Sequence, residues 1–409
     1  MNLKEFMKTC RIFGIPVLSF GSSDKLDYKR KQLKIFGIKI KYKNLNWLRH
    51  AAKYNLEQNI KNLSYEASKN NKNILFIASY FVEAGGIETR LLQYIKELEK
   101  FGWNVYLLSE NNSNKKLKEY INFYLNFDSS NVQECLEKII EKYNISCVEF
   151  QFKSSKILKN FDIKSLKRKT KLGCCLHNIG VKRIDKINKF DYKILVSGQM
   201  YQHHYKNILN PVIIKNSVNV SDFNNFPQWK FIGQKKAILI SRIGMEKIES
   251  IECFIKYCIK NSIPFEIAGG EQYKNTLKDK LVKKFNLKRN VFIGQINTLE
   301  YLKENLDKYL FIAGVGQVIL EGGIMGCPVF ISSSYNKENY SFLTKENFDL
   351  FDNFTIKSYS PINKENKKEL YLDLLNLEKY IIKDELVNKR SIDYCFKKYL
   401  EVIGAKYEK

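Results

Sequence analysis

A glycine-rich turn followed by a helix with a single acid is the part of the sequence best suited to hold a ligand. It lies in Phe311–Phe330, which reads FIAGVGQVILEGGIMGCPVF. Gly314 and Gly316 allow the backbone to approach a ligand, and the N–H groups that open the next helix at Gln317 point towards an anion in the turn. Glu321 falls about one and a half turns into this helix, where its carboxylate could reach sugar hydroxyls beside a phosphate. We predict nucleotide binding here, with an ordinary strand-helix-strand unit and a surface Glu as the alternative.

A second glycine pair precedes an earlier helix, in the segment YFVEAGGIE. Gly85 and Gly86 bring backbone N–H groups towards the end of the preceding strand, as in the first turn. Glu88 follows in the first turn of the helix, where a carboxylate complements the helix dipole without any ligand. We interpret the glycines as candidate binding residues and Glu88 as a helix-stabilising residue.

His177 comes directly after the apolar run KLGCCL. In doubly wound sheets ligands meet the carboxyl ends of the strands, so this position favours a role in a site. A histidine that is hydrogen-bonded for structural reasons is the alternative, and we expect His203 and His204 to be ordinary surface residues.

These residues need a scaffold, and the sequence supplies two series of alternating strands and helices. The first series contains strands at Asn73–Ser79, Val105–Leu108, Ile145–Phe152, Lys171–Leu176, Lys193–Val196 and Val212–Asn216, with helices at Ile87–Gly102, Val132–Tyr143 and Gln199–Leu209. The second contains strands at Lys236–Ser241, Pro264–Gly270 and 290–296, with helices at Ile251–Asn261, Tyr273–Phe285 and Leu299–Leu306, and then the stretch described first. This alternation predicts an α/β protein with two tandem Rossmann-like domains.

The periodicity also sets the domain boundaries. We predict a basic N-terminal extension over residues 1–71, a first Rossmann-like domain over 72–225 and a second Rossmann-like domain over 230–385. The pattern lapses over Asn219–Gly233, where we expect the interdomain connection, and two such domains in tandem imply a cleft between them. Helices are expected at Lys379–Val387 and Ile392–Ile403, and residues 386–409 are expected to pack back across the domains.

Two segments of the N-terminal extension have similar sequences and are called the echoed segments below: IFGIPVLSF at Ile12–Phe20 and IFGIKIKYK at Ile35–Lys43. The echo predicts two short strands that pair as a hairpin. A helix is expected over Leu45–Glu66. The mixture of basic and aromatic residues fits an anionic membrane surface, and a plain packing extension is the alternative.

Composition limits the classes of protein. The 409 residues are 44% hydrophobic, which is enough for substantial cores, and no run of about 18 apolar residues predicts a membrane span. Nine cysteines, without a CxxC pair, and no convincing signal peptide indicate a reduced, cytoplasmic protein. The net charge of +26 favours anionic partners, either phosphorylated substrates or a membrane surface. Nucleic acid is not expected, since the aromatic residues follow core-like patterns.

Taken together, these segments resemble the retaining GT-B glycosyltransferases of family four, the "group 1" transferases, over roughly Asn73–Ser334. Five motifs carry the resemblance in the family's order: GGIE at Gly85–Glu88, LHN at Leu176–Asn178, NSVNVSDF at Asn216–Phe223, SRIGMEK at Ser241–Lys247 and GQVILEGGIMGCPV at Gly316–Val329. The resemblance implies transfer of a sugar from a nucleotide-diphosphate sugar to a lipid-linked or surface-polysaccharide acceptor of the lipopolysaccharide or capsule type, by a protein that could be peripheral to the membrane.

The resemblance also implies that the first domain, 72–225, is the acceptor domain and that the second, 230–385, is the nucleotide-sugar-binding domain. It further implies roles for individual residues. Arg242 and Lys247 would hold and neutralise the departing diphosphate, which needs no metal. His177 would line the sugar pocket, and Glu321 would hold the ribose. The sequence has no Asp-x-Asp pair and no His/Cys cluster with ligand spacing, so we expect no metal and no cofactor besides the donor.

One departure from the family pattern is informative. Family members often carry two acids eight residues apart, and the position eight before Glu321 is Ala313. Its loss bears on contacts with the donor sugar. Two alternatives therefore stand beside the transferase: a catalytically weakened glycan-binding or scaffold protein of the same fold, and a sugar-nucleotide epimerase.

Overall fold

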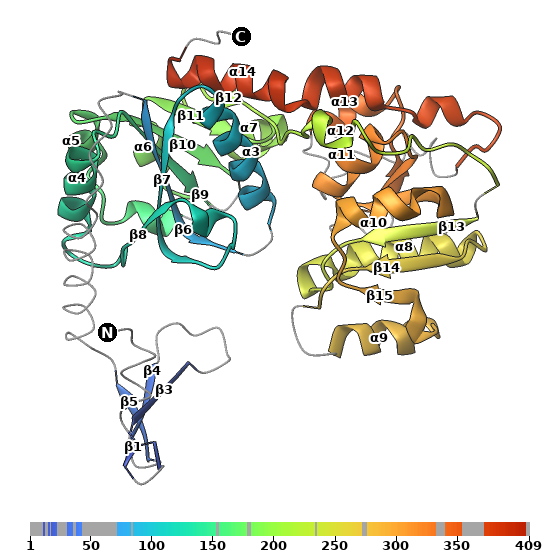
Figure 1. The fold of residues 1–409 in the computed structure, drawn as a ribbon, viewed down its shortest axis with the longest axis horizontal. Helices are drawn as coiled ribbons and strands as arrows, with labels where there is room; N and C mark the ends of the chain where they lie inside the picture. Colours follow the sequence, from blue (N-terminus) through green and yellow to red (C-terminus); the bar gives the residue numbers. More distant parts are fainter. Residues whose placement is uncertain are drawn as a thin grey trace. The chain divides into compact units, whose positions relative to one another are not determined.

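The computed structural model describes residues 72–353, apart from 83–84, 153–154, 178–180, 234, 272–275 and 333–339, and residues 372–405 (Figure 1). It also describes the backbone of five short strands within residues 11–42: β1 (Arg11–Ile12), β2 (Ile15–Pro16), β3 (Leu18–Ser22), β4 (Lys31–Ile35) and β5 (Ile38–Tyr42). Residues Met1–Glu66 and Ala67–Lys409 form two compact units, and each is considered by itself. The helix expected over Leu45–Glu66 lies outside the described residues.

The N-terminal strands pair differently from the predicted hairpin. β3 pairs antiparallel with β4, and β4 pairs antiparallel with β5, so the order is β3-β4-β5 and the two echoed segments flank a middle strand. Ile35 pairs with Ile38, which leaves a two-residue connection. Such short connections favour a local hairpin over pairing with a distant strand.

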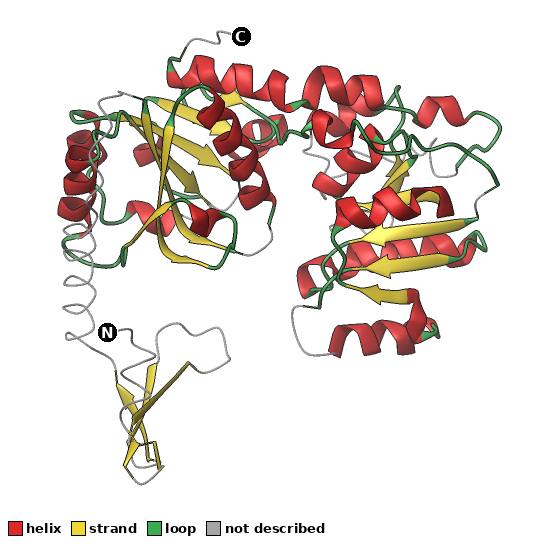
Figure 2. Ribbon diagram, viewed as in Figure 1, coloured by secondary structure: helices red, strands yellow, loops and turns green. Residues whose placement is uncertain are grey.

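The first large domain is built on a parallel sheet of seven strands in the order β12-β11-β10-β9-β6-β7-β8. The strands are β6 (Asn73–Phe81), β7 (Asn104–Asn112), β8 (Ile121–Tyr124), β9 (Cys147–Phe152), β10 (Lys171–Leu176), β11 (Tyr192–Leu195) and β12 (Val212–Ile213). Its helices are α3 (Gly86–Lys100), α4 (Val132–Lys142), α5 (Ile163–Lys167), α6 (Ile184–Ile187) and α7 (Gly198–His204). α4 and α5 lie on one side of the sheet and α3 on the other (Figures 1 and 2), as a sheet of continuous apolar strands requires.

Two elements of this domain differ from the prediction. The edge strand β8 was not predicted, and the helix expected over Gln199–Leu209 ends at His204. Tyr205 follows the helix with its side chain buried, and its hydroxyl oxygen accepts a hydrogen bond from the Val181 N–H at 3.3 Å, which fixes the chain where the helix ends. A tertiary contact therefore overrides the local helix pattern.

The second large domain has six strands in the order β15-β14-β13-β16-β17-β18, all parallel except β18. The strands are β13 (Lys236–Ile240), β14 (Phe265–Ala268), β15 (Phe292–Gly294), β16 (Tyr309–Gly314), β17 (Val329–Ser332) and β18 (Tyr340–Phe342). The helices are α8 (Ile248–Lys260), α9 (Thr276–Phe285), α10 (Thr298–Asn305), α11 (Gln317–Ile324) and α12 (Phe348–Asn353). Two apolar clusters cover the sheet: α8 and α9 contribute to one, and α10, α11 and α12 to the other. The fold class is therefore confirmed as two parallel-sheet α/β domains.

The segment expected as the interdomain connection packs onto the second domain. Phe223 and Trp229 belong to one of its apolar clusters, and the Trp229 indole N–H donates to the Tyr309 carbonyl oxygen at 2.8 Å. The chain therefore leaves the first sheet after β12 and joins the core of the second domain well before β13.

Two C-terminal helices follow, α13 (Lys383–Arg390) and α14 (Ile392–Ile403). α13 starts later than the helix predicted over Lys379–Val387, because a 3-10 turn at Leu377–Tyr380 comes first. α13 packs against α11, where a Cβ on Gly323 would lie 2.6 Å from Leu386 Cδ1. α14 packs against α3, with the rings of Tyr94 and Phe396 5.7 Å apart. No helix among the described residues is long and apolar enough to cross a membrane.

The connecting segment after β12 pairs with the junction of α13 and α14. The Val218 N–H donates to the Arg390 carbonyl oxygen at 2.8 Å, and the Ile392 N–H donates to the Val218 carbonyl oxygen at 2.9 Å. These two backbone hydrogen bonds fix the C-terminal helices to the connection.

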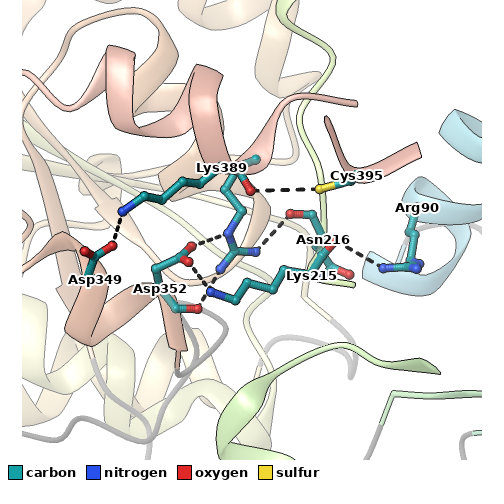
Figure 3. Close-up of polar contacts among 8 residues, drawn as sticks. Arg90, Lys215, Asn216, Asp349, Asp352, Lys389 and Cys395 are labelled. Carbon is teal, nitrogen blue, oxygen red and sulfur yellow. Dashed lines mark hydrogen bonds and ion pairs between the residues drawn. The ribbon is translucent and has the colours of Figure 1, made fainter. Parts of the chain in front are cut away.

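Buried charges reinforce this junction (Figure 3). Arg390 is 1% exposed and forms an ion pair with Asp352, which also pairs with Lys215. Arg390 Nη1 donates to the Asn216 carbonyl oxygen at 2.9 Å, and Arg90 on α3 donates to the Lys215 carbonyl oxygen at 3.2 Å. Such a fully paired network tolerates its burial, whereas loss of one member leaves an uncompensated charge.

Candidate functional site

The sheet order of the second domain brings several predicted site residues to one edge. β13 and β16 are neighbours and run parallel, so the loop with Arg242 and Lys247 leaves the same carboxyl edge as the turn with Gly314 and Gly316. A Cβ on Gly314 would lie 3.1 Å from the Ile240 carbonyl oxygen, which shows how closely the two strand ends approach. The carboxyl edge of a parallel sheet is where α/β domains bind ligands.

Gly269, at the end of β14, shapes the same edge. Its φ is +157°, and a Cβ there would lie 1.8 Å from the Ser241 carbonyl oxygen. Its N–H donates to the Gly294 carbonyl oxygen at 2.7 Å. The loop of Arg242 can therefore lie against the end of β14 only because residue 269 has no side chain.

Gly316 is the N-cap of α11 and has φ +70° and ψ −125°. This region of backbone conformation is open to glycine and strained for other residues. No atom lies within 4 Å of the position that a Cβ on Gly316 would occupy. The turn before α11 thus has a special backbone shape and open space in front of it, as an anion-binding helix start needs.

Glu321 lies on α11, one turn after Gln317, and is partly buried. Burial raises the pKa of its carboxyl to about 7, a hydrogen bond from the Gln317 side chain opposes this increase, and the nearby Asp222 adds to it. The carboxyl can therefore change its charge near neutral pH. Asp222 lies in the connecting segment and was not among the predicted site residues.

Arg242 is exposed, and Lys247 is half-buried at the start of α8. Met245 lies between them and is 62% exposed. The structure places both cations in the loop after β13, and their action on a diphosphate remains a prediction.

Ala313, the position at which family members often carry an acid, is fully buried in β16. It pairs with Leu239 of β13 and Phe330 of β17. This position therefore presents no polar group to a ligand, so any contact with a donor sugar must come from elsewhere.

In the first domain, Gly85 is the N-cap of α3 and Gly86 is its first residue. A Cβ on Gly86 would meet nothing within 4 Å, whereas a Cβ on Gly85 would lie 2.3 Å from Glu88 Oε2. Glu88 is 2% exposed, and its Oε1 accepts a hydrogen bond from the Val82 N–H at 3.1 Å. Glu88 thus fixes the glycine turn through the Val82 backbone, a more specific role than that of a dipole partner.

His177 follows β10 at the carboxyl edge of the first sheet. Its Nε2 lies 2.7 Å from Gln151 Oε1, and Gln151 Nε2 donates to Glu149 Oε1 at 2.5 Å. The imidazole is therefore within hydrogen-bonding distance of one buried side chain of β9, which is itself hydrogen-bonded to a second. Gln151 and Glu149 were not predicted, although their alternation in the apolar strand CVEFQF was a visible signal.

The predicted residues thus fall into two groups. Gly85, Gly86 and His177 lie at the carboxyl edge of the first sheet, where β9 separates β6 from β10. The second group lies at the carboxyl edge of the second sheet and consists of Arg242, Lys247, Gly314, Gly316, Gln317 and Glu321. Among the described residues, no cluster of three or more His, Cys, Asp or Glu side chains could hold a metal.

Neither a protein-family profile nor a curated protein sequence matches the chain. Solved structures do match. A glycosyltransferase from Rickettsia africae aligns with a TM-score of 0.58 at 16% identity, over 82% of this chain and 98% of that one. Anabaena HepE in complex with UDP-glucose aligns with a TM-score of 0.55 at 14% identity, over 81% of this chain and 99% of that one.

Two further matches point to different activities. The lipopolysaccharide outer core galactosyltransferase WaaB aligns with a TM-score of 0.53 at 12% identity, over 81% of this chain and 99% of that one. A putative UDP-N-acetylglucosamine 2-epimerase from Listeria monocytogenes aligns with a TM-score of 0.50 at 12% identity, over 81% of this chain and 95% of that one. At these identities the shared property is the fold, and the predicted architecture is confirmed: the chain has the GT-B fold of these glycosyltransferases.

Proposed function

We propose that this protein is a glycosyltransferase that moves a sugar from a nucleotide-diphosphate sugar to a hydroxyl of a lipid-linked or surface-polysaccharide acceptor. The observation that carries the proposal is the meeting of two loops at the carboxyl edge of the second sheet. One loop supplies Arg242 and Lys247, and the other supplies the glycine turn and the helix of Glu321. The similarity to UDP-glucose-bound HepE and to WaaB supports a nucleotide-sugar donor and a glycan acceptor.

In this proposal the second domain holds the nucleotide. The N-terminus of α11 faces the phosphates across the open turn at Gly316, since its N–H groups and dipole favour an anion. Glu321 accepts hydrogen bonds from the ribose hydroxyls, and Gln317 steadies its carboxylate. Arg242 and Lys247 bind the diphosphate as two cations.

The chemistry then depends on the leaving group. Breaking the bond between the sugar and the diphosphate leaves negative charge on the phosphate oxygens, and fixed cations stabilise it in the transition state. The acceptor hydroxyl attacks from the same face, its proton passes to the leaving diphosphate, and the anomeric configuration is retained, as in the family-four enzymes that the sequence resembles. His177 contacts the sugar from the first domain. The leaving group needs no metal in this scheme.

Two observations favour the alternatives. Ala313 leaves the site without the first acid, which favours a weakened glycan-binding protein, and the similarity to the Listeria epimerase favours an epimerase. An epimerase would interconvert nucleotide sugars without an acceptor, whereas the glycan-binding protein would bind sugars without turnover. Product analysis with and without an acceptor separates all three functions.

The first experiment is a thermal-shift screen of nucleotide-diphosphate sugars on the full chain, since a ligand of the folded state raises Tm. The best donor is then incubated with lipid-linked and polysaccharide acceptors, and the anomeric configuration of the product is determined by NMR. A retained configuration is expected. An inverted product would overturn the mechanism, and a donor converted to an epimer without acceptor would replace the transferase by the epimerase.

The cations are tested with a charge-matched pair of double variants. Arg242→Ala/Lys247→Ala should lower kcat by about 100-fold or more, because charge stabilisation at the leaving group is lost. The control Arg289→Ala/Lys280→Ala removes the same two charges from exposed positions of the same domain and should leave kcat within about twofold. Equal losses in both variants would show a general electrostatic effect and remove Arg242 and Lys247 from the site.

Glu321→Ala should weaken nucleotide binding about 5- to 150-fold, the loss of about 1–3 kcal/mol expected for hydrogen bonds to a charged group. Isothermal titration calorimetry with the best donor measures this change. Unchanged affinity would exclude Glu321 as the ribose ligand while leaving the role of the cations open.

A further inference from the structure

Two polar side chains are buried in β9, a strand that is otherwise apolar. Glu149 is 3% exposed and Gln151 is 4% exposed. Burying a carboxylate and an amide is unfavourable unless both are fully hydrogen-bonded. These residues belong to none of the sequence motifs, so their hydrogen bonds indicate what they do.

The hydrogen bonds around Glu149 fix the orientation of the Gln151 amide. Glu149 Oε2 accepts from the Tyr192 hydroxyl at 3.0 Å, and Oε1 accepts from Gln151 Nε2 at 2.5 Å. Because the amide nitrogen is directed at Glu149, the amide oxygen is directed at His177, whose Nε2 lies 2.7 Å away. A carbonyl oxygen only accepts, so Nε2 must carry a hydrogen. In the neutral imidazole the acceptor nitrogen is then Nδ1.

The register of three strands builds this arrangement. Gly173 of β10 pairs with Glu149 on one side and with Tyr192 of β11 on the other. A Cβ on Gly173 would lie 1.8 Å from Tyr192 Cζ, so the absence of a side chain lets the tyrosine ring lie across β10. The Tyr192 hydroxyl can thereby reach Glu149, two strands away.

Glu149 is buried beside a guanidinium. Burial raises the pKa of its carboxyl above the usual value, and the nearby Arg90 guanidinium and the hydrogen bonds from Gln151 and Tyr192 offset only part of this increase. Arg90 is itself buried and is held by the carbonyl oxygen of Ile214 at 2.8 Å. Both oxygens of Glu149 act as acceptors, which matches a carboxylate.

We propose that Gln151 and Glu149 are positioning residues for His177: they hold the ring and place its hydrogen on Nε2, and so set the orientation and the tautomer in which the imidazole contacts the bound sugar. The part that concerns the sugar rests on the proposed function. The part that concerns the tautomer does not.

The tautomer is tested by NMR on the full chain at pH 8 with ring-¹⁵N histidine. The chain has four histidines, and His177→Gln identifies the signals of His177 by their loss. We expect the hydrogen on Nε2 in the wild type, and a mixture of tautomers in Gln151→Met and in Glu149→Gln. Glu149→Gln preserves shape and volume and serves if Gln151→Met does not fold. A hydrogen on Nδ1 in the wild type, or an unchanged tautomer in both variants, would overturn the proposal.

Kinetics tests the consequence for transfer. Gln151→Met should lower kcat about 10- to 100-fold with KM for the donor changed less than about threefold, since the nucleotide is held by the other domain. Gln93→Met is the matched control, because Gln93 is a half-buried amide on α3 that accepts from the Ser217 hydroxyl at 3.0 Å. Equal losses of kcat in the two variants would count against positioning. If the wild type transfers no sugar, the proposed function fails, and the NMR result still decides the tautomer.

Discussion

The two domains hold their candidate site residues by different means. In the first domain His177 is held by side chains from β9 and β11, through hydrogen bonds that continue from Gln151 to Glu149 and Tyr192. In the second domain the turn at Gly316 is shaped by the backbone, and no atom lies near its missing Cβ. The position of His177 thus depends on hydrogen bonds between buried side chains, whereas the shape of the turn at Gly316 depends on the conformation of the main chain.

Each domain requires a glycine near its candidate site, but for a different physical reason. Gly173 has an ordinary strand conformation and is needed because the ring of Tyr192 occupies the space of its side chain. Gly316 has open space around it and is needed because its φ is +70°. A methyl group at residue 173 would disturb a side-chain network, whereas at residue 316 it would disturb the turn itself.

The largest expected effect is on the free energy of unfolding, and it should distinguish Glu149 from Glu321. Glu149→Ala should lower the free energy of unfolding by about 2–5 kcal/mol, because it leaves the Tyr192 hydroxyl and the Gln151 amide N–H buried without their acceptor, at about 1–3 kcal/mol for each group. Glu321→Ala should change it little at pH 8, or raise it, since the burial of that carboxylate is unfavourable. Urea denaturation followed by circular dichroism measures both. Equal destabilisation by the two variants would mean that the two sites are built alike.

The two glycines give the next test. Gly173→Ala should cost about 1–3 kcal/mol of stability through overpacking against Tyr192 and leave donor affinity unchanged. Gly316→Ala should cost a similar amount, about 1–3 kcal/mol, through backbone strain, and should also weaken donor binding. Gly102→Ala is the control, because that position has a φ of +73° and open space like Gly316 but belongs to neither group of site residues, so it should lose stability and keep its donor affinity. Thermal denaturation and calorimetry separate the effects, and unchanged binding in Gly316→Ala would exclude this turn as the phosphate site.

This difference explains how much of the molecule could be predicted from the sequence. The turn at Gly316 and the acid at Glu321 are five residues apart, so a local pattern reveals them together. The support of His177 comes from Gln151 and Tyr192, which are distant in sequence and meet only through the register of β9, β10 and β11. A single sequence contains the polar residues of β9 but not the strand order that makes them neighbours.

The fold could be predicted from the sequence because its helices and strands have strong periodicity and their alternation indicates a parallel sheet. The errors fall where local pattern competes with tertiary contacts. α7 ends before Tyr205, whose buried side chain contacts the Val181 backbone, and the four-residue edge strand β8 was missed because it is short. In the N-terminal unit, the similarity of the two echoed segments predicted that they pair with each other, whereas the short connection between β4 and β5 favours the pairing of those two strands.

The pH dependence of donor binding belongs to the second domain, and its magnitude is smaller than that of the stability changes above. Burial raises the pKa of Glu321 from 4.5 to about 7, so the folded chain keeps this proton at pH values where the unfolded chain has lost it. Stability should therefore fall, relative to Glu321→Gln, as the pH rises from about 5 to 8. Donor affinity should change in the opposite direction, because only the carboxylate accepts two ribose hydroxyls.

Between pH 6 and 8 the ionised fraction of a carboxyl with a pKa of about 7 rises about tenfold, and donor affinity should rise by the same factor, about 1.4 kcal/mol. A nucleotide sugar is the right probe, since its doubly esterified diphosphate does not titrate in this range. Glu321→Gln should flatten the profile, and Asp222→Asn should move its midpoint to lower pH because a nearby negative charge is removed. Glu149→Gln should leave the midpoint in place, because that carboxyl belongs to the other domain and supports His177 and not the ribose. A midpoint that follows residue 149 would reverse the assignment of the two acids and, with it, the distinction between a site held by side chains and a site shaped by the backbone.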